Sequence, residues 1–158
     1  KLKDSNGNNV IVKYLLTSKI RFSNIINNTE TLIEDEIIND KDTIIFIIKD
    51  KLSSDETLEE YFKSIYDKKQ IFCQYFWINS LTLNITKHEK VPKHIILNNS
   101  EKEDLIKKCQ ISSLDKLQYI KKTDPVAKYH GMKAGDICKI IRSSESAGMY
   151  INYRLCQN

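Results

Sequence analysis

Hydrophobic and polar positions alternate along the first half of the chain in patterns that predict strands separated by helical segments. Residues 9–16 (NVIVKYLL) and 43–49 (TIIFIIK) are rich in the β-branched residues that favour strands. The second run is apolar at successive positions, so we expect a strand covered on both faces. Residues 18–42, between them, are polar with isolated apolar pairs, and they predict one short element, either a helix or a strand.

A helix and a further strand follow the second apolar run. Three apolar residues recur at helical spacing in this region: Leu58, Phe62 and Ile65. We therefore expect a helix that begins after a cap at Ser54 or Asp55 and ends near Lys68. Residues 71–78 then predict an aromatic strand, with Trp77 in the core. The order of strand, helix and strand predicts a small α/β unit.

The character of the sequence changes at residues 84–94, NITKHEKVPKH. Pro92 has no backbone N–H, so it is compatible with an edge strand or an extended linker but not with a central strand. We place a domain boundary here, which gives a first domain at residues 1–83 and a second at residues 84–158.

Helix and turn signals follow in the second domain. Ser100 and Glu103 have the spacing of a capping box, which predicts a short helix ending near Cys109. Asp124 and Pro125 are the N-cap and first residue of another predicted helix. Two glycines complete the pattern, one ending that helix and one in a type II turn: Gly131 and Gly135.

The last part of the chain predicts a β-hairpin with strands at residues 137–142 and 149–156 and a compact connection at 143–148. In the returning strand, three residues should share the face that closes the core: Ile151, Tyr153 and Leu155. Three others should face the opposite way: Tyr150, Asn152 and Arg154. The predicted fold class is therefore α+β, with an N-terminal α/β domain and a small mixed domain that ends in a hairpin.

Composition excludes several classes of protein. The chain has 158 residues, of which 41% are hydrophobic and 29% charged, as is typical of globular domains. Its longest apolar run is of strand length, so we expect no membrane span. The net charge of +4 permits contact with nucleic acid but does not argue for it, because the lysines are scattered among acids.

Metal and redox chemistry have little support in the sequence. The four cysteines are far apart and form no CxxC pair, so reduced, partly buried thiols are expected, although a disulfide between Cys138 and Cys156 is sterically possible. His88 and His94 would share one side of a strand, but only Glu89 lies near them as a third ligand. We therefore expect no metal and no cofactor.

Motifs for nucleotide binding or nucleophilic catalysis are absent from the sequence, and Asp124 is accounted for as a helix cap. We therefore expect no enzyme activity and no small-molecule substrate. What stands out is the polarity of the hairpin. Arg142, Glu145, Tyr150 and Arg154 predict either an internal ion network or a set of side chains that bind a partner, since Arg and Tyr dominate interface energetics.

The same residues are part of a family likeness. The segment TDPVAKYHGMKAGDICKIIRSSESAGMYINYRLC (residues 123–156), with VPKHIIL (91–97) and NIT-H-E (84–89) before it, resembles the C-terminal domain of the shared fifth subunit of eukaryotic RNA polymerases. It also resembles the corresponding small subunit of archaeal RNA polymerase. The resemblance covers residues 84–158, about half of the chain. Residues 1–83 resemble only the topology of the eukaryotic family's N-terminal jaw domain, whose earliest helices have no counterpart here.

This resemblance implies a non-catalytic subunit of a DNA-directed RNA polymerase that acts in transcription. Its second domain would dock on the largest subunit and neighbouring subunits, and its jaw-like domain would lie near downstream DNA. The implied partner interface comprises Tyr129, Arg142, Ser144, Glu145, Tyr150, Tyr153 and Arg154. The jaw loop departs from the family by losing a proline and gaining acids, so only a weak, backbone-directed DNA contact through Lys49 and Lys51 is expected.

Two alternative functions follow from the residues alone. The first is a free-standing intracellular nucleic-acid-binding module that uses scattered lysines and exposed aromatic residues. The second is a small enzyme that uses His88, His94 or His130. The bias toward Ile, Asn and Lys suits an AT-rich eukaryote or a large DNA virus. The expected location is therefore the nucleus in the first case, and a virion or cytoplasmic viral factory in the second.

Overall fold

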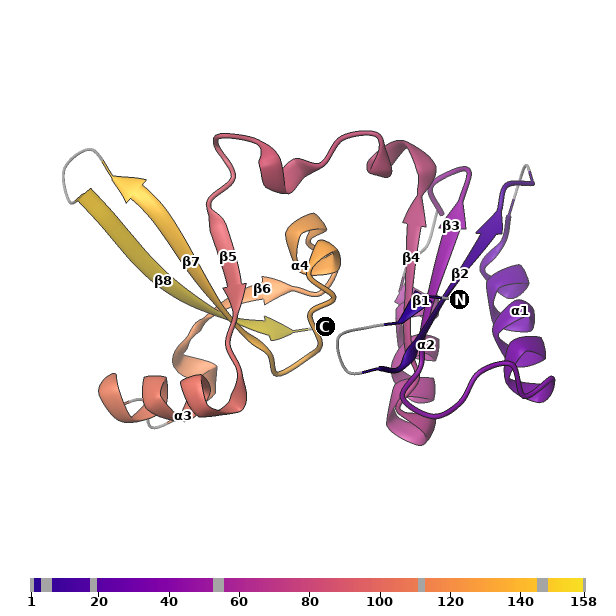
Figure 1. The fold of residues 1–158 in the computed structure, drawn as a ribbon, viewed down its shortest axis with the longest axis horizontal. Helices are drawn as coiled ribbons and strands as arrows, with labels where there is room; N and C mark the ends of the chain where they lie inside the picture. Colours follow the sequence, from indigo (N-terminus) through magenta and orange to yellow (C-terminus); the bar gives the residue numbers. More distant parts are fainter. Residues whose placement is uncertain are drawn as a thin grey trace. The chain divides into compact units, whose positions relative to one another are not determined.

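The computed structural model describes residues 2–3, 7–17, 20–52, 56–110, 113–144 and 148–157 (Figure 1). Contacts within the chain divide it into two compact units, Lys1–Leu83 and Asn84–Asn158. Each unit contains its own four-stranded sheet. The fold is therefore mixed, with α and β elements in both units, in agreement with the predicted α+β class.

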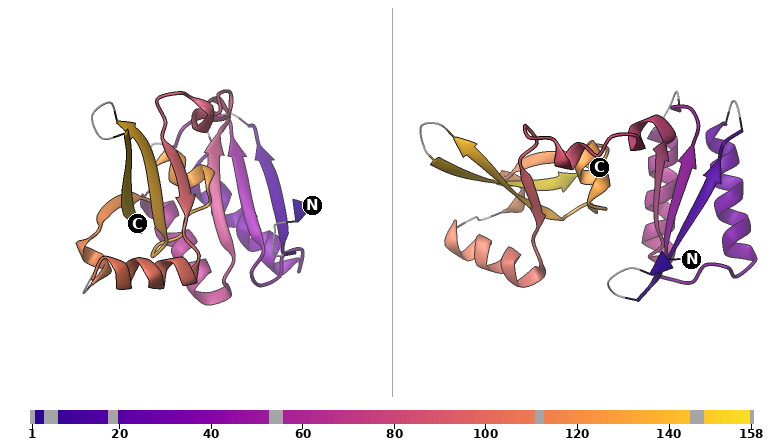
Figure 2. Two further views of the ribbon diagram at one scale, coloured as in Figure 1. Left: turned by 60° about the vertical axis from the view of Figure 1, so that its left-hand side comes forward. Right: turned by 45° about the horizontal axis from the view of Figure 1, so that its top comes forward.

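The first unit is built around a largely parallel sheet in the order β1-β2-β3-β4. Strands β2, β3 and β4 are parallel, and the two-residue β1 pairs antiparallel with β2 (Figures 1 and 2). The elements along the chain are β1 (Leu2–Lys3), β2 (Asn9–Leu15), α1 (Phe22–Glu34), β3 (Thr43–Ile48), α2 (Glu56–Lys69), β4 (Phe72–Trp77) and the 3-10 turn η1 (Ile78–Leu81). The open question over residues 18–42 is thus answered by a helix, α1.

Both helices of this unit pack on one face of the sheet. Alternate residues of β3 that point to this face are buried, and they join the core with residues of α1 and α2. Phe46 of β3 stacks on Phe62 of α2 with ring centroids 6.4 Å apart. The predicted stripe of α2 is confirmed, since Leu58, Phe62 and Ile65 are all buried.

The expectation that β3 is covered on both faces is wrong. Ile45 and Ile47, on the face away from the helices, are only half-buried. Trp77 is also not a core residue, because 39% of its surface is exposed. It ends β4, which is an edge strand of the sheet, and the chain then turns into η1. An aromatic residue at the end of an edge strand has neighbours on one side only, so its size does not ensure burial.

The buried carboxylate of Asp42 joins the start of β2 to the loop that precedes β3. Asp42 is 3% exposed and accepts hydrogen bonds from the backbone N–H groups of Asn9 (2.9 Å) and Asn39 (3.0 Å). The Asn9 side chain donates to the same carboxylate. Because a buried acceptor without donors is costly, this arrangement fixes where β2 and β3 begin relative to one another.

The second unit has a mixed sheet in the order β5-β7-β8-β6. Strands β5 and β8 are both antiparallel to β7, which lies between them, and β6, which the sequence did not predict, is parallel to β8. The elements are the 3-10 turn η2 (Ile85–Lys87), β5 (Lys93–Ile96), α3 (Asn99–Lys108), the 3-10 turn η3 (Leu114–Lys116), β6 (Gln118–Lys121), α4 (Pro125–Tyr129), β7 (Ile137–Ser144) and β8 (Gly148–Gln157). The strand after Pro92 lies at the edge, as expected.

Each face of this sheet carries a small core. On one face, Ala127 of α4 and Met132 pack against Cys138, Ile140 and Cys156. On the other face, Leu105 of α3 packs against Ile137, Leu155 and Leu97. The hairpin of β7 and β8 therefore forms the centre of the unit, with one short helix on each side.

Local signals at the helix ends are partly confirmed. The Asp124 carboxylate accepts hydrogen bonds from Val126 N–H (2.8 Å) and Ala127 N–H, and Pro125 begins α4. The capping box of α3 was predicted two residues too late. It is formed by Asn98 and Glu101, not by Ser100 and Glu103. The predicted caps of α2, Ser54 and Asp55, lie outside the described residues.

The turn before the hairpin has the predicted form. Gly135 has a positive φ of 89°, and Asp136 N–H donates to Lys133 C=O over 3.0 Å. Asp136 is also held by Lys102 of α3, whose Nζ lies 3.1 Å from Oδ1. The salt bridge joins the helix to the start of β7.

All four cysteines are free thiols, so Cys138 and Cys156 do not form the disulfide that their positions allowed. No helix among the described residues is long and apolar enough to cross a membrane.

Candidate partner-binding surface

The β7–β8 hairpin extends beyond both helices that cover its base (Figures 1 and 2). Strand β8 has 10 residues and therefore spans about 33 Å, whereas the 10 residues of α3 span about 15 Å and the five of α4 about half of that. Two such short helices cannot cover both faces of the hairpin along its length. The outer half of the hairpin is consequently exposed on both sides.

The register of the hairpin decides which side chains share a face. Arg142 of β7 lies opposite Tyr150 of β8, and Cys138 lies opposite Arg154. Because directly opposed residues of an antiparallel pair point to the same side, these residues share one face of the sheet. This is the face covered at its base by α4. We call the part of it formed by Arg142, Tyr150, Asn152 and Arg154 the polar face of the hairpin; the first two are exposed and the last two half-buried.

Most of the predicted interface residues lie on or beside the polar face. Arg142 is exposed, and Tyr150 is 53% exposed. Arg154 is half-buried, and its Nε is a buried atom without a hydrogen-bond partner among the described residues. Tyr129, at the end of α4, is 55% exposed.

The remaining predicted residues have different positions. Tyr153 points to the opposite face, where it packs against the core beneath α3. Ser144 is the last residue of β7 and lies opposite Gly148. Glu145 lies outside the described residues, so the internal ion network proposed for it is not tested. Within the described part of the chain, neither Arg142 nor Arg154 forms an ion pair.

The opposite face of the hairpin is apolar and was misjudged from the sequence. Ile151 was expected to close the core with Leu155, but 42% of its surface is exposed, while Leu155 is 6% exposed. Met149 on the same face is 75% exposed, and Tyr119 of β6 is 46% exposed. We call Met149, Ile151 and Tyr119 the apolar face. The length of β8 relative to α3 is the sequence signal that would have revealed it.

Tyr129 is held by residues from the start of the unit. Side-chain hydrogen bonds with Asn84 and Thr86 lower the pKa of the Tyr129 phenol, with a smaller contribution from Lys87. Asn84 also caps η2 by accepting hydrogen bonds from Thr86. Two of the segments that carry the family resemblance, NIT and DPVAKY, therefore lie beside one another.

The ring of His130 lies beside two other rings. Its centroid is 5.3 Å from that of Tyr129 and 6.5 Å from that of His94. Burial and the neighbouring His94 lower the pKa of His130. His88 is exposed, and its Nδ1 accepts a hydrogen bond from Lys90 N–H. Among the described residues, no three His, Cys, Asp or Glu side chains gather in a group that could hold a metal ion.

In the first unit, the predicted DNA-contact residues follow the carboxyl end of β3. Lys49 and Lys51 are both exposed, and Asp50 between them is exposed too. Trp77 lies at the same end of the sheet, because its partner in the register is Ile48. The surface here thus combines two lysines and an accessible indole ring with one acid.

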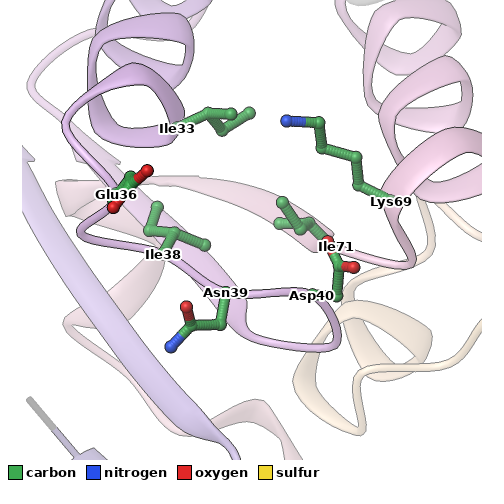
Figure 3. Close-up of a pocket in the computed structure, with 7 residues that line it drawn as sticks. All are labelled: Ile33, Glu36, Ile38, Asn39, Asp40, Lys69 and Ile71. Carbon is green, nitrogen blue, oxygen red and sulfur yellow. The ribbon is translucent and has the colours of Figure 1, made fainter.

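A cavity of about 590 Å³ lies at the other end of the first unit (Figure 3). Its described lining comprises Ile33, Glu36, Ile38, Asn39, Asp40, Lys69 and Ile71. Figure 3 shows that Lys69 and Ile33 point toward one another across it. Its polar groups come from one lysine, one amide and two carboxylates, a combination that defines no particular chemistry.

The fold and this surface together define a class of protein: an α+β protein whose second unit carries a hairpin with an outer half that no helix covers. Residues 83–156 match the family model described as RNA polymerase Rpb5, C-terminal domain. The second unit therefore belongs to the family of the fifth subunit shared by eukaryotic RNA polymerases.

Similar proteins come from several eukaryotes. The chain is 44% identical over 89 residues to the DNA-directed RNA polymerases I, II, and III subunit rpabc1 of Dictyostelium discoideum, which is 56% of this chain and 45% of that protein. It is 43% identical over 82 residues to subunit RPABC1 of Caenorhabditis elegans and of Caenorhabditis briggsae, which is 52% of this chain and 38% of either protein. The match thus spans less than half the length of these relatives.

Proposed function

We propose that the chain is a non-catalytic subunit of a DNA-directed RNA polymerase and that the β7–β8 hairpin docks on the largest subunit. The observation that supports this most strongly is the match of residues 83–156 to the Rpb5 C-terminal domain. The hairpin adds a physical reason, because three successive large apolar or aromatic side chains of β8 are exposed, Met149, Tyr150 and Ile151, and such a group often marks an interaction surface.

Docking through the hairpin would involve both of its faces. Arg and Tyr side chains contribute most to interface energies, and Arg142, Tyr150 and Arg154 offer both types on one face. A carboxylate of the partner subunit would pair with Arg142, which is exposed, or with the accessible part of Arg154, which is half-buried.

We further propose that the first unit is the jaw-like part of the subunit and lies near downstream DNA. Lys49 and Lys51 would then contact phosphate groups, while Asp50 weakens that contact. Binding of this kind is independent of base sequence and falls steeply as salt rises.

The competing function, a free-standing nucleic-acid-binding module, makes a different prediction for the isolated chain. It requires measurable DNA binding that depends on salt, whereas a subunit with two exposed lysines beside an acid should bind little DNA alone. Fluorescence anisotropy with labelled duplex DNA at about 50 and 200 mM salt separates the two. Tight binding at the lower salt that collapses at the higher would favour the free-standing module.

We propose the nucleus as the location, because the relatives reported above are subunits of the polymerases of cellular eukaryotes. Their names give the viral alternative, with a virion or cytoplasmic factory, no support.

The experiment that tests the proposed function is affinity capture of the tagged full chain from its own cells, followed by mass spectrometry. We expect the largest subunits of RNA polymerase to be recovered at stoichiometric levels, and the names of the relatives require that those of polymerases I, II and III all be sought. Recovery of the chain without any polymerase subunit would refute the proposal.

A further inference from the structure

The outer edge of β8 is open along most of the hairpin. Strand β7 pairs with residues 148–155 of β8, but β6 pairs only with residues 154–157 on the other side. Among the described residues, the segment 148–153 therefore has a neighbouring strand on one side only. An edge of this length presents backbone groups that can pair with another strand.

Hydrogen bonds at the base of β8 identify which backbone groups point outward. Cys156 N–H donates to Asp136 C=O and Cys156 C=O accepts from Gly135 N–H, so Cys156 faces the β7 side. Gln157 C=O instead accepts from Lys122 N–H on the β6 side. Because strand residues alternate, the odd-numbered residues of the open segment direct their backbone groups outward, away from β7: Met149, Ile151 and Tyr153.

At the end of the open edge next to β6, the outward backbone N–H already has a hydrogen-bond acceptor. Tyr153 N–H donates to the Asn152 side-chain oxygen over 2.8 Å, and the Asn152 amide donates to Gln118 of β6. The amides of Met149 and Ile151 are thus the two outward donors on the open edge.

This edge lacks the features that usually prevent edge-to-edge pairing. The sequence GMYINY of residues 148–153 contains no charge and no proline. The other edge of the sheet differs, because β5 begins with Lys93 directly after Pro92. The contrast indicates that the β8 edge is kept available for a partner.

The side chains beside the edge specify what kind of strand would fit. An added strand points its side chains alternately to the two faces of the sheet. On one face it would meet the exposed Met149 and Ile151, and on the other Tyr150 and Arg154. Apolar residues suit the first face.

The positive charge of the second face, the polar face of the hairpin, indicates which side chains the added strand should present there. Arg142 and Arg154 lie on this face, and the described residues of β7 and β8 include no acid. A carboxylate is the acceptor that pairs most strongly with a guanidinium group.

We propose that the outer edge of β8 at residues 149–153 receives an extended segment of the polymerase subunit on which the chain docks, a segment in which apolar residues alternate with Asp or Glu. This segment adds a fifth strand to the sheet by pairing with the backbone of Met149 and Ile151. The inference rests on the proposed function, since it assigns the segment to that subunit.

Residue-resolved amide hydrogen exchange of the full chain, free and within purified polymerase, tests the pairing. In the free chain, the Met149 and Ile151 amides should exchange fast, whereas Tyr150 and Asn152, which face β7, should exchange slowly. In the complex, the amides of Met149 and Ile151 should slow by at least about tenfold, as hydrogen-bonded strand amides do. Unchanged exchange at Met149 and Ile151 in a chain that is bound to polymerase overturns the inference but leaves the proposed function intact.

Failure of the chain to enter the polymerase at all is a different outcome and refutes the proposed function itself.

A pair of substitutions separates the contribution of backbone pairing from that of side-chain contact. Ile151→Pro removes the outward amide and spares the bonds to β7, and Ile151→Ala keeps the amide while removing the same apolar side chain. We expect Ile151→Pro to reduce incorporation into polymerase at least about tenfold relative to Ile151→Ala.

Met149→Pro and Met149→Ala form a second pair, nearer the tip, if the first proline variant does not fold. Equal incorporation of the proline and alanine variants at either position would contradict strand addition.

Discussion

The Asn84 side chain lies beside the phenol of Tyr129 and lowers its pKa, so the first turn of the second unit lies against the end of α4. Thr86 acts on the same phenol, and it is tied to Asn84 by a 2.6 Å hydrogen bond. The exposed Tyr129 thus already has two polar neighbours at its phenol, and such neighbours reduce the entropy that a side chain loses on binding.

The hydrogen bonds of Tyr129 can be measured through its titration. Because Asn84 and Thr86 lower the pKa of the phenol, Tyr129 should ionise at a lower pH than it would in the unfolded chain. Asn84→Ala should move its pKa back toward the ordinary value. NMR titration of the Tyr129 ring carbons in the full chain and in Asn84→Ala provides the measurement. An unchanged titration in Asn84→Ala would contradict this arrangement.

Stability of the second unit should fall in mild acid because of His130. Burial and His94 lower the pKa of His130 in the folded chain, so the unfolded chain binds the proton more readily. The contribution is therefore complete above the unfolded pKa of about 6.5 and is lost as the pH falls through the lower folded value.

Urea unfolding followed by NMR signals of residues 84–158 at pH 7.5 and 5.5 tests this. His130→Asn should show a smaller loss of stability between the two pH values than the unsubstituted chain, and His88→Asn, at an exposed position, serves as the control. An equal loss in His130→Asn and in the control would rule out His130 as the source.

Substitution of two residues on the same face of β8 should change the free energy of unfolding by very different amounts. Leu155 is 6% exposed and packs with Ile137 beneath α3, so Leu155→Ala should lower the free energy of unfolding by about 2–5 kcal/mol. Ile151 is 42% exposed, and Ile151→Ala should change it by about 0.5 kcal/mol or less. Urea unfolding of both variants measures this, and similar losses would mean that the outer hairpin belongs to the core.

The cysteines should differ in reactivity. Burial raises the pKa of the Cys156 thiol to about 11, with a further contribution from Asp136, and burial also raises the pKa of Cys138. Cys109 is exposed. Since the thiolate is the reactive form, alkylation near pH 8 should modify Cys109 first, and Cys138 and Cys156 only after unfolding. Mass spectrometry of partly alkylated chain checks the order, and early modification of Cys156 would contradict its burial.

Several elements could be predicted because the signal was local. Asp124 and Pro125 specify the start of α4 through their own backbone chemistry, and Leu58, Phe62 and Ile65 mark one face of α2 regardless of what covers it. The cap of α3 was misplaced for a related reason. The sequence NNSEKE contains two overlapping capping boxes, and only the position of Leu105 against Ile137 distinguishes them.

Other features depend on what surrounds a residue and were not visible in the sequence. Trp77 and Ile151 are both apolar and both lie in strands, yet one lies at the end of an edge strand and the other beyond the reach of α3. Strand β6 was missed because QYIK is short and its partner β8 is distant in sequence. The polar face of the candidate surface was predicted, but its apolar face and open edge required the register and the helix lengths.

The central claim, that the hairpin is the docking surface for a polymerase, is tested most directly by the amount of an Arg154→Glu chain that co-purifies with RNA polymerase from cells. We predict that it folds but is lost from the polymerase, because a reversed charge opposite a desolvated carboxylate costs about 2–5 kcal/mol or more. Lys121→Glu, the same reversal at an exposed position of β6, should be incorporated normally. Normal incorporation of Arg154→Glu would contradict the account.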